Sequence, residues 1–116
     1  MKHITLAAAC ALTLTMIAPQ ADAQLAIKGK SAQALHCAAI QFSVSEVLFS
    51  GGLIDPSDRD AGQLKAVRYL NHVPGDDRTK MKAMKKRLVQ LLDSRSLLDL
   101  VSEWDKSRKW CARTFS

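Results

Sequence analysis

The fold is decided by residues 31–52, SAQALHCAAIQFSVSEVLFSGG. Ser31 is a favoured residue type just before a helix, and Gly51-Gly52 is typical of a helix end. Between these signals the apolar residues fall on two opposite sides of a helix. One side carries Cys37, Ile40, Val44, Val47 and Leu48, and the other carries Leu35, Ala38, Ala39, Phe42 and Phe49. Because two apolar faces need neighbours on both sides, we expect 31–50 to be the most buried helix.

A second helix is expected before Val73-Pro74-Gly75, a sequence that stops helices. Its start has two interpretations. In one, Ser57 and Asp60 form a capping box. In the other, Asp55 is the N-cap and Pro56 takes the first helical position. The helical spacing predicts the inward residues Ala61, Leu64, Val67, Tyr69 and Leu70.

Two more helices are predicted in the C-terminal part of the chain. Asp76-Asp77 suits the positive end of a third helix. Its core residues would be Met81, Met84, Leu88, Leu91 and Leu92. The polar stretch 93–96 predicts a turn and a new N-cap, with one continuous helix as the alternative. The fourth helix would bury Leu97, Leu100, Val101, Trp104 and Cys111.

Two cysteines lie in these helices, Cys37 near the start of the first and Cys111 near the end of the last. An even number of cysteines in a small exported domain predicts a disulfide. A redox pair would have closer spacing, and a zinc site would need more ligands than His36 and His72 supply. In an up-down bundle the two cysteine-bearing ends meet. We therefore predict an all-α protein, a small antiparallel helical bundle of about four helices closed by one disulfide.

The first 23 residues have the pattern of a secretory signal peptide. Lys2 precedes an apolar run over 4–17, and Ala21-Asp22-Ala23 is a small-x-small cleavage site. A run of about 14 residues is shorter than the roughly 20 that span a bilayer. The alternatives are an uncleaved membrane anchor and lipid attachment at Cys10.

Cleavage between Ala23 and Gln24 would leave a flexible lead-in over 24–30 and a single helical domain over 31–116. The mature protein would be exported, to a periplasm or to the outside medium. That location is also the one in which a structural disulfide forms and persists.

The composition favours one globular domain: 116 residues, of which 47% are hydrophobic and 24% are charged. The chain lacks the sequence motifs of serine hydrolases, zinc proteases, P-loop proteins and dinucleotide-binding enzymes. His36 and His72 have simpler structural roles, beside a cysteine and at a helix end. We therefore expect no catalytic residue, no metal ligand and no cofactor.

Positive charge is concentrated in two segments of a chain whose net charge is +6. Residues 78–87 contain six basic residues and no acid: Arg78, Lys80, Lys82, Lys85, Lys86 and Arg87. Near the C-terminus, Arg108, Lys109 and Arg113 surround Trp110. An up-down bundle would bring both groups to the same end, so we expect one candidate binding surface. The alternatives are an ordinary solvated face on 78–87 and a Trp110 that seals the bundle over the disulfide.

These features predict a small exported, non-enzymatic binding protein whose basic surface meets an acidic protein or an anionic envelope component. The alternative is a peripheral membrane-surface protein that binds anionic lipid through the amphipathic helix 78–92. A small enzyme is the third possibility. Nucleic acid is not expected as a partner, because exported proteins seldom meet it and no aromatic residues interleave the charges.

Overall fold

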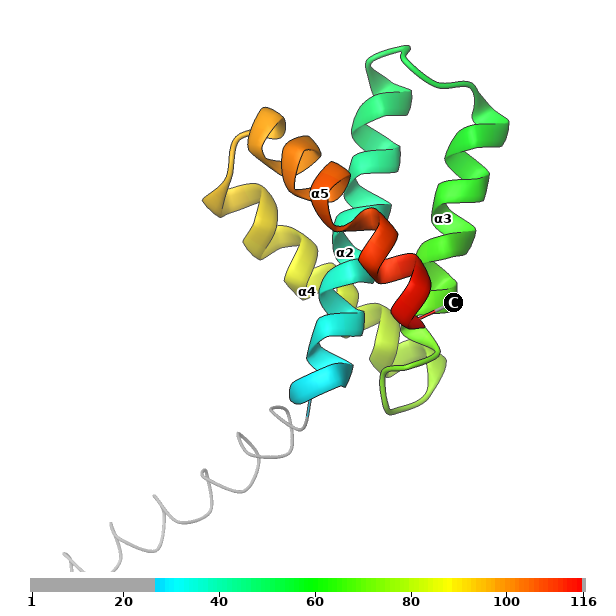
Figure 1. The fold of residues 1–116 in the computed structure, drawn as a ribbon. Helices are drawn as coiled ribbons and strands as arrows, with labels where there is room; N and C mark the ends of the chain where they lie inside the picture. The colour runs from blue at the N-terminus through cyan, green and yellow to red at the C-terminus, as the bar shows by residue number, and fades with distance from the viewer. Residues whose placement is uncertain (1–26, 116) are drawn as a thin grey trace, which may run out of the picture.

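The computed structural model describes residues 27–115, and all regular structure in that range is helical. The helices are α2 (Gly29–Ser50), α3 (Pro56–Leu70), α4 (Asp77–Ser94) and α5 (Leu97–Phe115) (Figure 1). The prediction of an all-α domain with four helices is confirmed for this part of the chain. The predicted signal peptide and its Ala23–Gln24 cleavage site lie outside the described residues.

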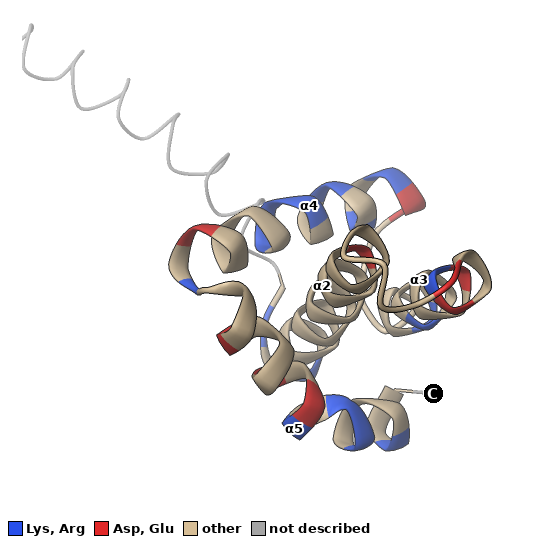
Figure 2. Cartoon of the chain, turned by 90° about the horizontal axis from the view of Figure 1, so that it is seen from above, with Lys and Arg blue, Asp and Glu red and all other residues tan. Residues whose placement is uncertain are grey.

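The central helix is α2, and the other three helices pack around it (Figure 2). Its buried residues are Ala34, Cys37, Ala38, Ala39, Ile40, Gln41, Ser43, Val44 and Ser45. They occur on several sides of the helix, as the two apolar faces predicted. The helix begins at Gly29, inside the predicted lead-in, rather than after Ser31.

The order of packing around α2 differs from that of a regular up-down bundle. The helices α3 and α4 follow one another in the chain but barely touch. Each of them packs mainly on α2, as α5 does. The prediction of about four helices around one core is therefore correct. The regular up-down arrangement, in which helices adjacent in the chain pack side by side, is not observed for α3 and α4.

The helix ends follow the capping signals in the sequence. The Asp55 side chain accepts a hydrogen bond of 2.9 Å from the backbone N–H of Asp58, and Pro56 is the first residue of α3. The N-cap interpretation of Asp55 is therefore correct, and the capping-box interpretation is wrong. The Ser96 hydroxyl accepts a hydrogen bond of 3.2 Å from the Asp99 backbone N–H. The helices α4 and α5 are thus separate, and the continuous-helix alternative is wrong.

The inward face of α3 differs from the predicted one. Its buried residues are Gly62, Ala66, Tyr69 and Leu70. The predicted inward residues Leu64 and Val67 are instead 52% and 49% exposed, and Ala61 is exposed as well. The reason is a close approach at Gly62, where an added Cβ would lie 2.9 Å from the Cβ of Ser45. Only glycine allows this approach, so it fixes which side of α3 faces α2.

Two leucines near the α4–α5 turn were also predicted to be buried and are exposed. Leu92 is 44% exposed and Leu97 is 55% exposed. The buried residues of these two helices are Met84 and Leu91 in α4, and Leu100, Cys111 and Phe115 in α5. Some of the apolar residues at this turn therefore remain outside the core.

The helix α5 is attached to α2 by a covalent bond and by a buried polar contact. The sulfur atoms of Cys37 and Cys111 are 2.10 Å apart, which confirms the predicted disulfide. Further along α5, the Trp104 indole N–H donates a hydrogen bond of 2.9 Å to the Gln41 side-chain oxygen. Gln41 is buried and also donates from its amide nitrogen to the Ser45 hydroxyl at 3.2 Å. The two contacts determine how α5 lies across α2.

Candidate functional site

Four of the predicted binding residues share the outward side of α4, and we call them the basic face: Arg78, Lys82, Lys85 and Lys86. All four are exposed, while Met84 and Leu91 on the opposite side are buried. Figure 2 shows the Lys and Arg positions distributed along this helix. Within residues 27–115, none of the four forms an ion pair with an acidic side chain. Their charges are therefore available to a partner.

The other two cations of this segment lie elsewhere on α4. Lys80 and Arg87 are only partly exposed. The Arg87 guanidinium donates hydrogen bonds to His36 at 3.1 Å and to Gln90 at 3.4 Å. Arg87 is therefore part of the contact between α4 and α2, and it does not belong to the basic face.

The second predicted group, on α5, is partly neutralised. Arg108 forms an ion pair of 3.2 Å with Asp105, and its guanidinium lies 5.2 Å from the centre of the Trp104 ring. Lys109 and Arg113 are exposed. Of the three α5 cations predicted to bind, only these two are without an acidic partner in the described part of the chain.

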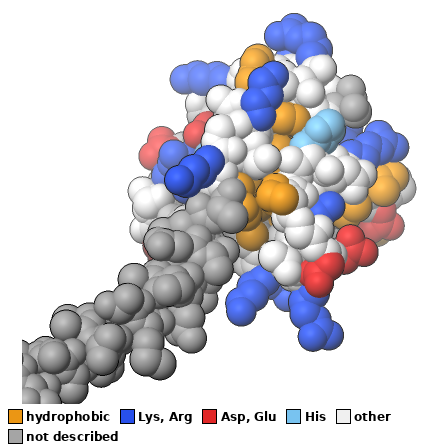
Figure 3. All heavy atoms as spheres, turned by 90° about the horizontal axis from the view of Figure 1, so that it is seen from below, with side chains coloured by type: hydrophobic (Ala, Val, Ile, Leu, Met, Phe, Trp, Pro, Cys, Tyr) orange, Lys and Arg blue, Asp and Glu red, His pale blue; other side chains and the backbone are white. Residues whose placement is uncertain are grey.

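The structure does not support the expectation that both groups form one surface. Seen from above, α4 and α5 lie on different sides of α2 (Figure 2). Seen from below, Lys and Arg side chains project around the rim of the molecule rather than gathering in one patch (Figure 3). The two helices diverge from their common turn because the core of α2 lies between them. The basic face of α4 is therefore the larger of two separate groups.

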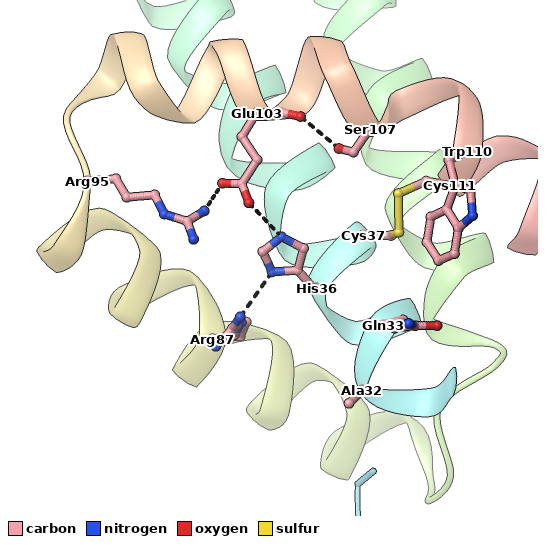
Figure 4. A pocket seen from close by; sticks show the side chains of 10 residues that line it. All are labelled: Ala32, Gln33, His36, Cys37, Arg87, Arg95, Glu103, Ser107, Trp110 and Cys111. Atoms are coloured by element: carbon pink, nitrogen blue, oxygen red, sulfur yellow. Dashed lines mark hydrogen bonds and ion pairs between the residues drawn. A yellow bond between two sulfur atoms is a disulfide. The ribbon is translucent and has the colours of Figure 1, made fainter. Parts of the chain in front are cut away.

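Trp110 has both an exposed edge and packing contacts. It is 40% exposed, and its ring meets the Phe115 ring edge-on with 5.7 Å between the ring centres. Figure 4 shows its indole beside the Cys37–Cys111 disulfide. These contacts match the alternative in which Trp110 covers the disulfide, while its exposed part remains available for binding.

An open pocket of about 440 Å³ lies between α2, α4 and α5. Its walls include His36, Arg87, Arg95, Glu103 and Trp110 (Figure 4). The pocket thus holds two arginines, one carboxylate and one histidine next to the disulfide. It is the place where the three helices exchange polar contacts.

His36 connects α4 and α5 through its two ring nitrogens. Nδ1 is 3.1 Å from the Arg87 guanidinium, and Nε2 is 3.2 Å from a carboxylate oxygen of Glu103. Since arginine only donates, Nδ1 must accept, and Nε2–H then donates to Glu103. Arg95 completes the cluster with an ion pair to the same carboxylate. A neutral His36 satisfies every partner in this arrangement.

The surroundings of His36 favour this neutral form. Burial lowers the pKa of His36 below 6.5, and the positive charges of Arg87 and Arg95 lower it further. Protonation would place a hydrogen on Nδ1, where it would face the Arg87 guanidinium. At neutral pH, His36 is therefore neutral and links α2 to α4 and α5 through its two ring nitrogens.

The pocket contains no nucleophile paired with a base. Both nitrogens of His36 have partners, and the Ser107 hydroxyl donates to the Glu103 backbone carbonyl at 2.8 Å. The two cysteines are joined to each other. Among residues 27–115, no three His, Cys, Asp or Glu side chains gather in a way that could hold a metal ion. The arrangement is suited to holding the three helices together.

The sequence offered no signal for this cluster. His36 and Glu103 are 67 residues apart, and Gln41 and Trp104 are 63 residues apart. Helical periodicity identifies which residues share one helix face, but not which residue of another helix lies opposite. Both pairs depend on how α5 crosses α2.

Comparison with models of protein families, with curated proteins and with solved structures found no match. In the described part of the chain, no helix combines the length and the apolar character needed to cross a membrane.

Proposed function

We propose that this protein is an exported, non-enzymatic binding protein that attaches to an anionic partner through the basic face of α4. The observation that carries this proposal is the set of four exposed cations without an acidic partner among residues 27–115. Lysines and arginines side by side on one helix face repel one another by a few tenths of a kcal/mol per pair. An anionic partner removes this repulsion and gains attraction in its place.

Export is supported by the disulfide and by the N-terminal pattern. Disulfides persist in oxidising compartments and are rare in the reducing cytosol. A signal peptide over residues 1–23, cleaved before Gln24, would deliver the chain to such a compartment. The anionic partner would then be an acidic protein or a component of the cell envelope.

A binding role is also supported by the chemistry of the pocket. Its histidine, its carboxylate and both arginines are engaged with one another, and this engagement stabilises the packing of three helices. Binding through exposed lysines needs no such arrangement. Long-range attraction would speed the encounter with the partner, and salt would weaken it.

Charge reversal tests the proposal. We expect Lys82→Glu, Lys85→Glu and Lys86→Glu together to abolish retention of the purified protein on immobilised polyglutamate. The matched control reverses Lys65, Arg68 and Lys106, which are exposed, lie on α3 and α5, and have no ion pair in the described residues. Because both variants have the same net charge, retention of the control alone would locate binding on α4. Equal retention of both variants would refute the proposal.

The α5 group is tested separately through Trp110. If its exposed edge contributes to binding, Trp110→Ala should weaken retention by about 1 kcal/mol or more. If it only covers the disulfide, the same substitution should lower the melting temperature and leave retention by the folded protein unchanged. Measuring both quantities on one variant distinguishes the two roles.

A further inference from the structure

Exposed apolar side chains are unusually dense at the end of the α4–α5 hairpin. We call four of them the apolar tip: Val89 (54% exposed), Leu92 (44%), Leu97 (55%) and Leu98 (83%). They fall within ten consecutive residues, and Leu98 is the most exposed large hydrophobic residue of the described chain. Clustered exposed apolar side chains mark interaction sites, whereas single ones are ordinary.

The apolar tip continues the basic face in the same direction. At 100° per residue, Val89 and Leu92 fall on the same side of α4 as Lys82, Lys85 and Lys86. Leu97 and Leu98 form the start of α5, and only Arg95 and Ser96 separate them from α4. The turn lies at the edge of the molecule, away from α3 (Figure 1). A surface laid against the outward side of α4 would meet the lysines together with Val89 and Leu92, and Leu97 and Leu98 follow at the same end of the helix.

We propose that this hairpin docks on an anionic lipid bilayer, with the apolar tip inserted among the headgroups and the basic face lying along the surface. The inference rests on the proposed function and names its partner as a membrane surface.

Two features of the hairpin favour a bilayer over an acidic protein. The apolar tip protrudes and forms no groove, so a rigid partner would need a cavity of matching shape, whereas a headgroup layer deforms around it. Basic residues beside inserted leucines are also the pattern by which helices bind anionic membrane surfaces without crossing them.

Exposed acidic residues beside the apolar tip oppose this docking, and one of them, Asp93, provides a sensitive test. Asp93 is exposed on the same side of α4 as the lysines, next to the apolar tip. An anionic surface would repel its carboxylate. Asp93→Asn should therefore strengthen binding to anionic vesicles about fivefold if the tip enters the headgroup layer.

The main experiment is flotation of the purified protein with vesicles of phosphatidylglycerol and phosphatidylcholine, compared with phosphatidylcholine alone. The protein is produced with its own N-terminal segment, so that the cell performs any processing. We expect binding to the anionic vesicles only. Replacing Lys82, Lys85 and Lys86 by Gln should weaken binding about 100-fold, since each lysine contributes about fivefold near an anionic surface.

The apolar tip is tested by Leu97→Gln with Leu98→Gln, which should weaken vesicle binding at least about tenfold. The matched control is Leu64→Gln with Val67→Gln on α3, where two similarly exposed apolar residues lie away from the hairpin. The control should bind vesicles as the unmodified protein does. Because all four residues are exposed, melting curves should confirm that every variant folds.

The outcomes separate this inference from the proposed function. Loss of vesicle binding in the tip variant, with retention on polyglutamate unchanged, supports docking on a bilayer. Vesicle binding that is absent, or equal in the tip variant and the unmodified protein, overturns the inference. In that case, polyglutamate retention that depends on the lysines would keep the proposed function, with an acidic protein as partner. If the lysine variants change neither measurement, both proposals fail.

Discussion

Breaking the Cys37–Cys111 bond should remove a large part of the stability of this domain. The bond closes a loop with a sequence separation of 74 residues, which is most of the described chain. For a loop of that length, the chain-entropy relation gives about 4.5 kcal/mol at 25 °C. Reduced unfolded chains retain some structure, so the measured loss in the free energy of unfolding should be about 2–4 kcal/mol.

The assay compares unfolding of the oxidised protein with unfolding of the same protein in reductant. Reduction leaves both sulfur atoms in place, and the two side chains are only 1% and 3% exposed. The comparison therefore isolates the cross-link from the loss of core volume. For a domain of this size, the expected loss corresponds to a decrease in melting temperature of about 10–25 °C.

A variant with Cys37→Ala and Cys111→Ala provides the control. It should be slightly less stable than the reduced protein, because it also leaves a cavity, and it should not respond to reductant. The entropic reasoning would be refuted if oxidised and reduced proteins unfolded within about 0.5 kcal/mol of each other. That result would mean that the unfolded reduced chain is already about as restricted as the unfolded cross-linked chain.

Three further predictions concern packing, pH and processing. Gly62→Ala should lower the free energy of unfolding by about 1 kcal/mol, because the new Cβ would lie 2.9 Å from the Ser45 Cβ. This loss is expected despite the better helix propensity of alanine. In a Ser45→Gly background, chemical denaturation should show that the same substitution is neutral or stabilising. The pKa of folded His36 is below its ordinary value of 6.5, so the unfolded chain takes up protons first and stability should fall as the pH drops below about 6.5. His36→Gln keeps an acceptor for Arg87 and a donor for Glu103, and its melting temperature should change less between pH 7.5 and pH 5; equal changes in both proteins would argue against a neutral His36 in the folded protein. N-terminal sequencing of the exported protein should begin at Gln24, and a retained leader or a lipid on Cys10 would contradict the predicted cleavage.

The helices and the disulfide could be predicted from the sequence. Helix ends depend on signals from a few neighbouring residues, and the disulfide follows from the number of cysteines. Asp55 with Pro56 and the polar stretch 93–96 are capping signals that act within a few residues. Cys37 and Cys111 allow one intramolecular pairing once Cys10 is assigned to the leader. The central position of α2 followed from its two apolar faces, which few surface helices have.

The rotation of α3 could not be predicted from its own composition. Leu64 and Val67 are larger and more apolar than Gly62 and Ala66, so a periodicity argument places the larger residues inside. Close packing favours the opposite orientation. Small residues on α3 let the backbones of α2 and α3 approach, and this approach buries more of the surface of α2. Exposed Leu64 and Val67 on α3 are the result.

From the distribution of buried residues, we expect that the basic face can be altered without unfolding the protein. The central helix α2 contributes nine buried residues, and α5 is bonded to it through Cys111. The helix α4 contributes only Met84 and Leu91 as buried residues, with Arg87 as its polar contact to α2. The lysines of the basic face are exposed, so replacing them should change the charge of the surface and leave the core unchanged. Because α4 buries so few residues, most of its outward side is available to a partner. Binding and stability depend on different residues of this helix, so both can be measured independently on each variant.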